Sequence, residues 1–175
     1  MTAAPDPRPL TGEPLALDLL NTRWMKEGVV QDLLRDVDGL AVWLDANGLD
    51  HTADEETLGH VLQARDALRK AVDGEDVAAV DAVLGHGRIR ATLTVDGPGE
   101  LPEFGDPSWG PAWLAARSYL ELLTIAPDRI RGCAHESCIL HFFDTSRNGT
   151  RRWCSMAACG NRAKASRHYA RSKDA

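Results

Sequence analysis

The sequence predicts an α+β protein in which a helix-rich N-terminal domain with a short sheet precedes a small cysteine-rich module. Apolar residues keep helical spacing over residues 54–72 and alternate with polar residues over 89–95, and all four cysteines lie in the last quarter of the chain. The 175 residues, 43% of them hydrophobic, suffice for one domain and a small module. We expect a disordered leader over 1–12, an α+β domain over 13–128 and the module over 129–175.

The first half of the domain is expected to contain one strand and two helices. Leu15, Leu17 and Leu19 alternate with other residues, which predicts a short strand over 14–22. Asp38 is a candidate N-cap for a helix that Asn47-Gly48 would end. The clearest helix runs from Asp54 to Val72, because its apolar residues share one face and its charges lie on the other.

The second half of the domain is expected to contain two helices and a strand. Val77, Val80 and Val83 would face inward from a helix over 76–84, and residues 89–95 predict a half-buried strand. Residues 96–107 are rich in glycine and proline, which predicts a loop. Ser108 is a candidate cap for the last helix of the domain, which Pro127 would end.

Charge is distributed unevenly along the chain. The net charge is −6, but from Cys133 onward there are eight Lys/Arg and three Asp/Glu, a net +5, which leaves −11 for the rest. A locally basic segment favours contact with nucleic acid. The Pro-rich start does not resemble a signal peptide, and no apolar run reaches membrane-spanning length, so we expect a cytoplasmic protein without a membrane partner.

The cysteines form two pairs, each with four residues between its members. In a reducing cytoplasm such pairs predict metal ligands rather than disulfides, and four thiolates predict one closed, structural zinc site. Four unrelated thiols, two disulfides, or a ligand set that includes His135 or His141 are the alternatives. The predicted zinc ligands are Cys133, Cys138, Cys154 and Cys159.

The module is expected to order its elements as metal loop, β-hairpin, metal loop and helix. Asn148-Gly149 predicts the hairpin turn, which would return the chain through Arg151–Trp153. A helix would run from about Asn161 to Arg171, with Gly160 allowing a tight turn before it. Its basic face is typical of a phosphate-contacting element, although a solvated helix end has the same charges. That face and the hairpin supply Lys164, Arg167, His168, Arg171, Arg147, Arg151 and Arg152.

A polar cluster follows the predicted first strand. Asp18, Asn21, Thr22 and Arg23 could line a small-molecule pocket, or Asp18 could simply bond the backbone at the strand end. No nucleophile–base pair, phosphate loop or carboxylate pair is recognisable in the sequence. We therefore expect a protein that is not an enzyme.

The residues from Cys133 to Arg171 resemble the CGNR zinc finger, whose signature is Cys159-Gly160-Asn161-Arg162. The segment LALDLLNT at 15–22 resembles the start of the ABATE domain, which commonly precedes this finger in bacterial stress-induced transcriptional regulators. The resemblance implies DNA binding by the finger. Within the signature, Arg162 could face a phosphate or could reach back to bond Asp144. It implies more weakly that the N-terminal domain senses a ligand or partner.

Two arrangements are consistent with these features. The first is a zinc-dependent DNA-binding transcriptional regulator, which would need a homodimer for specific binding because one finger reads few bases. The second is a structural or protein-interaction module, in which the basic finger docks on the acidic N-terminal domain or in a dimer interface.

Overall fold

The computed structural model describes residues 5–165, and it confirms the α+β class. Its helices are α1 (Leu15–Leu20), α2 (Val37–Ala46), α3 (Glu55–Val72), α4 (Ala78–Leu84) and α5 (Gly110–Ile125). The short 3₁₀ and π turns are η1 (Pro107–Trp109), η2 (Pro127–Arg129) and η3 (Met156–Gly160). Strands pair as three antiparallel hairpins, β1 (Arg23–Lys26) with β2 (Val29–Asp32), β3 (Gly87–Thr94) with β4 (Gly97–Phe104), and β5 (Ile130–Gly132) with β6 (His141–Phe143).

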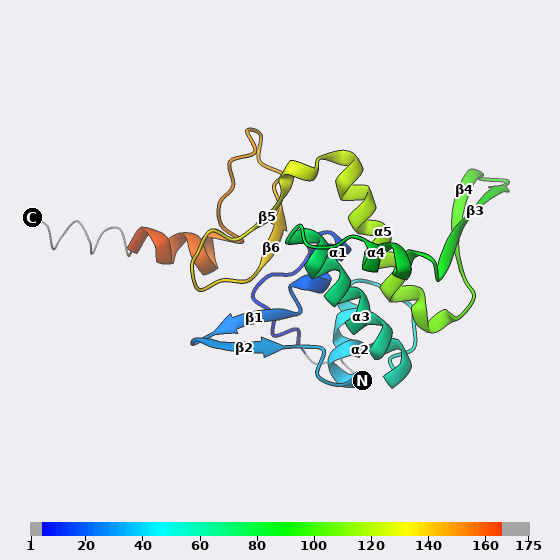
Figure 1. Cartoon of the computed structure of the whole chain (residues 1–175), viewed down its shortest axis with the longest axis horizontal. Coiled ribbons are helices and arrows are strands. Elements are labelled where there is room, and N and C mark those ends of the chain that lie inside the picture. Colours follow the sequence, from blue (N-terminus) through cyan, green and yellow to red (C-terminus); the bar gives the residue numbers. More distant parts are fainter. Residues whose placement is uncertain (1–4, 166–175) are drawn as a thin grey trace, which may run out of the picture.

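The core of the N-terminal domain forms where α1, α3 and α5 pack together (Figure 1). The strand predicted over 14–22 was wrong, because Leu15–Leu20 is a helix. Ala16, Leu17, Leu19 and Leu20 are all buried, so this segment is covered on every side. A short apolar run of this kind does not distinguish a strand from a buried helix by its periodicity.

Two aspartates start the helices that follow. The prediction for α3 is confirmed, and Asp54 accepts a hydrogen bond from the Thr57 amide at 2.8 Å. The cap of α2 is Asp36 rather than Asp38, with the Gly39 amide donating at 2.9 Å. An N-cap must precede the first helical turn in extended backbone, and Asp36 occupies that position.

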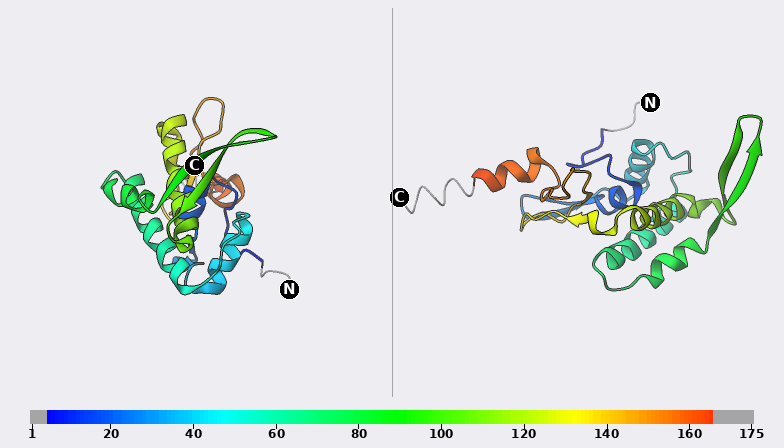
Figure 2. Two further views of the ribbon diagram at one scale, coloured as in Figure 1. Left: turned by 90° about the vertical axis from the view of Figure 1, so that its right-hand side faces the viewer. Right: turned by 90° about the horizontal axis from the view of Figure 1, so that it is seen from above.

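The β3–β4 hairpin corrects two predictions. Residues 97–104 are a strand rather than a loop, paired with β3 along its whole length. Proline is tolerated there because a two-stranded ribbon has free edges. Leu93 is 83% exposed, so β3 is not half-buried near its tip. The hairpin projects from the body at the end opposite the C-terminal module (Figure 1, Figure 2).

The entry to α5 also differs from the prediction. Asp106 caps η1 by accepting from the Ser108 amide at 2.9 Å, and α5 continues from it, so Ser108 is not the cap. Helix α5 ends at Ile125, just before Pro127, as predicted. Among residues 5–165, none of the helices combines the length and the hydropathy that a membrane span needs.

Residues 5–12, which were expected to belong to a disordered leader, pack on the domain instead. Arg8 is buried, and its guanidinium forms ion pairs with Asp6 at 2.7 Å and with Asp18 at 2.6 Å. A buried arginine needs carboxylate partners of this kind. The sequence alone does not show that Asp6 and Asp18 pair with Arg8. Residues 1–4 lie outside the described part.

Candidate metal centre and nucleic-acid interface

The β5–β6 hairpin and η3 bring the four predicted cysteines together. The hairpin closes the first metal loop, where the Cys133 amide donates to the Leu140 carbonyl at 2.9 Å. Ser155 accepts from the Ala158 amide at 2.9 Å and so starts the turn that carries Cys159. All four Sγ atoms lie within 4.8 Å of one another.

This donor set fits one zinc ion. A tetrahedral site with Zn–S bonds of about 2.3 Å needs sulfur–sulfur separations of about 3.8 Å. The Sγ atoms of Cys138 and Cys154 are 3.9 Å apart, and those of Cys154 and Cys159 are 3.6 Å apart. All four cysteines are free of disulfides. The four sulfurs would hold zinc as a closed structural site, leaving no position for substrate.

The pKa values of the cysteine thiols are also consistent with a site that binds a cation. The hydrogen bond with Cys154 lowers the pKa of the Cys138 thiol to about 5. The same hydrogen bond and burial raise the pKa of Cys154, and burial raises the pKa of Cys159 to about 12. Four thiols this close ionise together only when a positive ion offsets their charge, which zinc would do.

The hairpin of the module is not the predicted one. Strand β6 pairs with β5 across the first metal loop, and residues 151–153 form no strand. The fully buried Asp144 carboxylate explains the difference, because it accepts from the Ser146 hydroxyl at 2.6 Å and from the Arg151 amide at 2.9 Å. These bonds fold residues 145–150 back on themselves. Gly149 does adopt φ of 61°, as the turn signal implied.

Gly160 is buried beside Cys159 and does not supply a left-handed turn. Its φ is not in the left-handed region, whereas a Cβ there would lie 2.5 Å from the Met156 sulfur and 3.4 Å from Trp153. Because the Met156 side chain is flexible and exposed, a larger residue at position 160 would displace it.

The module docks on the N-terminal domain through polar and apolar contacts. The Asn21 amide donates to the His141 carbonyl at 2.9 Å and accepts from the His141 amide at 2.8 Å. Glu13 accepts from the Phe143 amide at 2.9 Å. A second, smaller core joins Trp24 of β1 to Leu140, Phe142, Cys154 and Cys159. Sequence patterns gave no signal for these contacts, because their partners lie more than 100 residues apart.

Family models match both parts of the chain. Residues 129–172 match the CGNR zinc finger, and residues 13–125 match ABATE, described as "Putative stress-induced transcription regulator". The chain belongs to the ABATE family. No curated protein matches it. The ABATE domain is thus followed by a CGNR zinc finger with a four-cysteine zinc site, as the resemblance implied.

The residues predicted to contact DNA separate into three groups. Arg147, Arg152, Arg162 and Lys164 are exposed on the finger. Arg162 donates through Nε to the Ala158 carbonyl at 2.7 Å and not to Asp144. Arg167, His168 and Arg171 lie outside the described residues.

Arg151 differs from the exposed arginines of the finger because its side chain bonds to groups of both the finger and the ABATE domain. Its guanidinium lies 4.1 Å from the centre of the Phe142 ring, forms an ion pair with Glu13 at 3.1 Å and donates to the Trp153 and Cys154 carbonyls. Arg151 therefore links the finger to the ABATE domain. Charge alone could not separate this arginine from its exposed neighbours.

The predicted ligand cluster is brought together, but largely as internal structure. Asp18, Asn21 and Thr22 are buried, and each is hydrogen-bonded within the protein. Asp18 accepts from Trp43 Nε1 and from Asn47 Nδ2, each at 3.0 Å. These three side chains are thus used in hydrogen bonds inside the protein. Arg23 is partly exposed.

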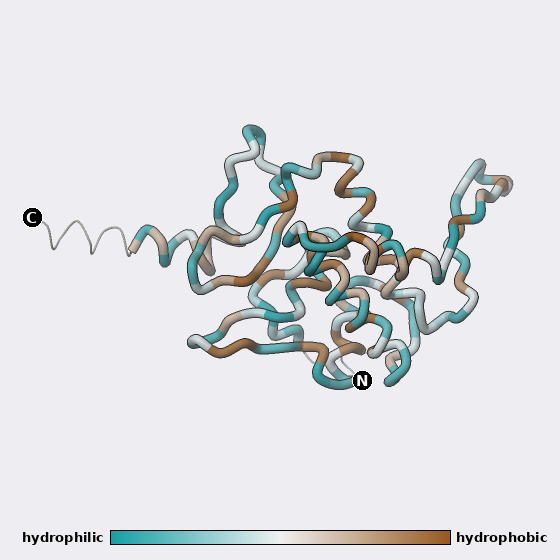
Figure 3. Tube along the Cα trace, in the orientation of Figure 1, coloured by the Kyte–Doolittle hydropathy of each residue, from teal (hydrophilic) through white to brown (hydrophobic). Residues whose placement is uncertain are grey.

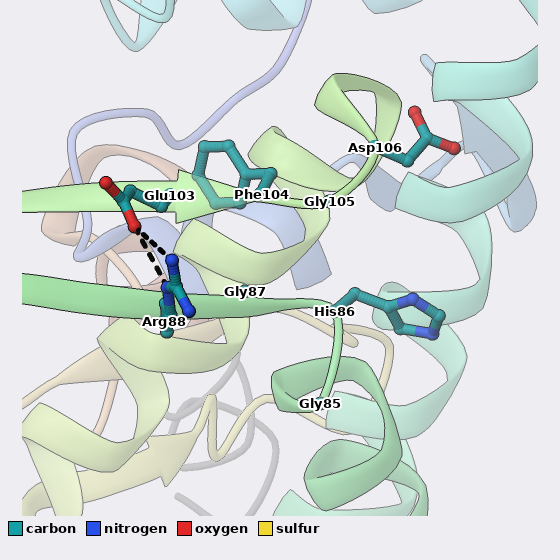
Figure 4. Close-up of a pocket in the computed structure, with 8 residues that line it drawn as sticks. All are labelled: Gly85, His86, Gly87, Arg88, Glu103, Phe104, Gly105 and Asp106. Atoms are coloured by element: carbon teal, nitrogen blue, oxygen red, sulfur yellow. Dashed lines mark hydrogen bonds and ion pairs between the residues drawn. The ribbon is translucent and has the colours of Figure 1, made fainter.

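A hollow lies at the base of the β3–β4 hairpin, where the hairpin joins the rest of the ABATE domain (Figure 4). Its volume is about 850 Å³, and it is open to solvent. Arg88 and Glu103 in its wall pair with each other at 2.8 Å, and the His86 ring stacks on Trp109 at 3.5 Å. Because Arg88 and Glu103 pair with each other, their charges largely offset one another within the hollow.

Proposed function

We propose that this ABATE protein is a zinc-dependent, DNA-binding transcriptional regulator, in which the finger contacts DNA and the ABATE domain senses a ligand or partner. The observation that carries the proposal is the exposure of Arg147, Arg152, Arg162 and Lys164 around the metal centre. Lysine and arginine that remain free of carboxylates can neutralise phosphates and release counterions.

The arrangement of the molecule is also consistent with DNA contact by the finger. The loop over 145–150 and the helical turns over 156–165 lie on the side of the molecule away from the β3–β4 hairpin (Figure 1). The loop is mostly hydrophilic, whereas the hairpin tip contains hydrophobic residues (Figure 3). The chain before Cys133 carries −11, so DNA would be repelled from most of the ABATE domain and attracted to the finger.

The direct test is fluorescence anisotropy of a labelled duplex with zinc-loaded protein at low salt. Replacing Arg152→Glu and Lys164→Glu together should weaken binding about tenfold or more. The slope of log K against log salt concentration should also become shallower, by about 0.9 for each phosphate that the protein no longer neutralises. Arg88→Glu with Arg90→Glu, on the β3–β4 hairpin, makes the same change in net charge away from the finger. Absence of binding by the unmodified protein, or an equal loss in this control, would contradict the proposal.

A second candidate is that the finger acts mainly as a structural or protein-interaction module. The ion pair between Arg151 and Glu13 and the paired bonds between Asn21 and His141 favour it. This function predicts no DNA binding at low salt, together with a less stable ABATE domain when zinc is removed. The two proposals are therefore separated by one anisotropy titration and one unfolding curve.

A homodimer would reconcile a single finger with specific binding. One short helix reads few base pairs, and specific recognition usually doubles the contact by symmetry. Sedimentation of the zinc-loaded protein with and without DNA tests this part of the proposal, which predicts two chains per bound duplex.

A further inference from the structure

Three arginines lie near the junction of the ABATE domain and the finger, and among residues 5–165 they form ion pairs with one carboxylate, that of Asp32. Arg65 and Arg69 are four residues apart on α3 and so share one face, and Arg23 begins β1. Asp32 of β2 binds Arg65 through two hydrogen bonds of 2.7 and 2.9 Å, and it lies 3.7 Å from Arg23. One carboxylate thus serves two guanidinium groups.

Arg69 is the group left without a partner. Its Nε and Nη2 are buried and have no hydrogen-bond partner among residues 5–165. Asp66 and Asp73, on either side of it in the chain, favour its charged form, yet no carboxylate of the described residues forms an ion pair with it. Buried polar groups nearly always have a partner, and an unpaired buried charge is costly.

Other buried nitrogens near Arg69 also lack a hydrogen-bond partner among residues 5–165. Nε of Arg65 and Nδ1 of His141 are also buried without a hydrogen-bond partner in the described part of the chain. Burial and the nearby positive charge of Arg23 lower the pKa of Arg69. Burial and the charge of Arg69 lower the pKa of His141. Arg23 and Arg65 thus lie close enough to Arg69, and Arg69 close enough to His141, for their charges to interact.

We propose that Arg23, Arg65, Arg69 and His141 form a binding site for a small phosphate-class oxyanion, either free or as the terminal group of a metabolite. Nε and Nη2 of Arg69 are the two parallel donors with which a guanidinium binds an oxyanion. The Arg23 side chain is 38% exposed, which leaves a route from solvent. The site does not depend on DNA binding.

The position of the site gives the anion a structural effect. Arg23, Arg65 and Arg69 belong to the ABATE domain, whereas His141 begins β6 of the finger. A ligand that contacts both parts stabilises the arrangement in which they are docked. Binding should therefore protect the β6 amides against hydrogen exchange.

The test is calorimetric titration of the zinc-loaded full chain with inorganic phosphate, compared with chloride at equal ionic strength. We expect saturable binding of one phosphate per chain. Arg69→Met should weaken it by about tenfold or more, because the variant has no charge-assisted hydrogen bonds to offer at this position. Arg90→Met, which removes an exposed arginine from the β3–β4 hairpin, should leave it unchanged.

A second variant and a second ligand complete the test. Arg69→Lys keeps the charge but loses the two parallel donors, so it should also bind more weakly, and it serves if Arg69→Met does not fold. Glycerol 3-phosphate compared with inorganic phosphate distinguishes an esterified from a free phosphate, and binding of either supports the site. Failure of both to bind, or equal affinity in both Arg69 variants and the unmodified chain, would overturn it. A negative DNA titration alone would leave it standing.

Discussion

At the scale of single residues, Asp18 connects three segments of the ABATE domain. Its carboxylate lies in α1, pairs with Arg8 of the N-terminal segment and accepts from Trp43 and Asn47 at the end of α2. Arg8 and Asp18 are both buried, so the Asp18 charge is offset by Arg8, and the Arg8 charge is offset by Asp18 together with Asp6. Asp18 is therefore a stabilising residue of the domain.

Replacing Asp18→Asn should destabilise the ABATE domain by about 3 kcal/mol, because the buried Arg8 charge would lose one of its two carboxylate partners, and Trp43 and Asn47 would lose a charged acceptor. Urea unfolding followed by tryptophan fluorescence measures this. Asp96→Asn, in the exposed turn of the β3–β4 hairpin, removes the same charge and should change stability by no more than about 0.5 kcal/mol. Equal stabilities for the two variants would show that the Arg8 pair contributes little.

At the scale of elements, the β5–β6 hairpin does two tasks. One of its ends closes the first metal loop, and β6 packs against α1. Asn21 satisfies both backbone polar groups of His141, as a neighbouring strand would. The finger is thereby fixed to the ABATE domain at the same element that helps to form its zinc site.

Replacing Asn21→Ala should loosen this junction by about 2 kcal/mol, because two buried backbone groups of His141 lose their partners. Hydrogen exchange would show faster exchange of the His141 amide, while zinc content stays unchanged. Asn148→Ala, in the exposed loop of the finger, is the matched control and should have no effect. Unchanged exchange in the Asn21 variant would mean that the apolar contacts alone hold the finger.

At the scale of the whole molecule, the zinc site and the ABATE domain share a core. Trp24 packs with Phe142 and with two of the zinc ligands, Cys154 and Cys159. The acidic domain thus holds the finger by its inner face and leaves Arg152 and Lys164 exposed. This division of the basic residues, with Arg151 used internally, is what allows one chain to combine docking with a free cationic surface.

The features that the sequence predicted well are local ones. Helix α3 has a cap and a long amphipathic repeat, and the cysteine spacing encodes the metal site within one segment. Helix α1 was mistaken for a strand because it is buried on all sides. Strand β4 was missed because its glycines and prolines indicate a loop unless the partner strand is known.

Contacts between distant segments could not be predicted in the same way. The bonds of Asn21 to His141 and of Glu13 to Arg151 depend on the tertiary arrangement, which no local pattern encodes. For the same reason the polar cluster at Asp18 was interpreted as a pocket, although it is internal structure. A single sequence identifies polar residues but does not say which of them are satisfied.

Selection of duplex DNA from a random pool, with zinc-loaded protein and with chelator-treated protein, tests the central claim most directly. Zinc supplies about 10–16 kcal/mol of folding free energy in structural sites, so chelation should unfold the finger and disperse its basic surface. We expect enrichment of a defined sequence with the zinc-loaded protein and none after chelation. No enrichment with zinc, or the same enrichment after chelation, would contradict it.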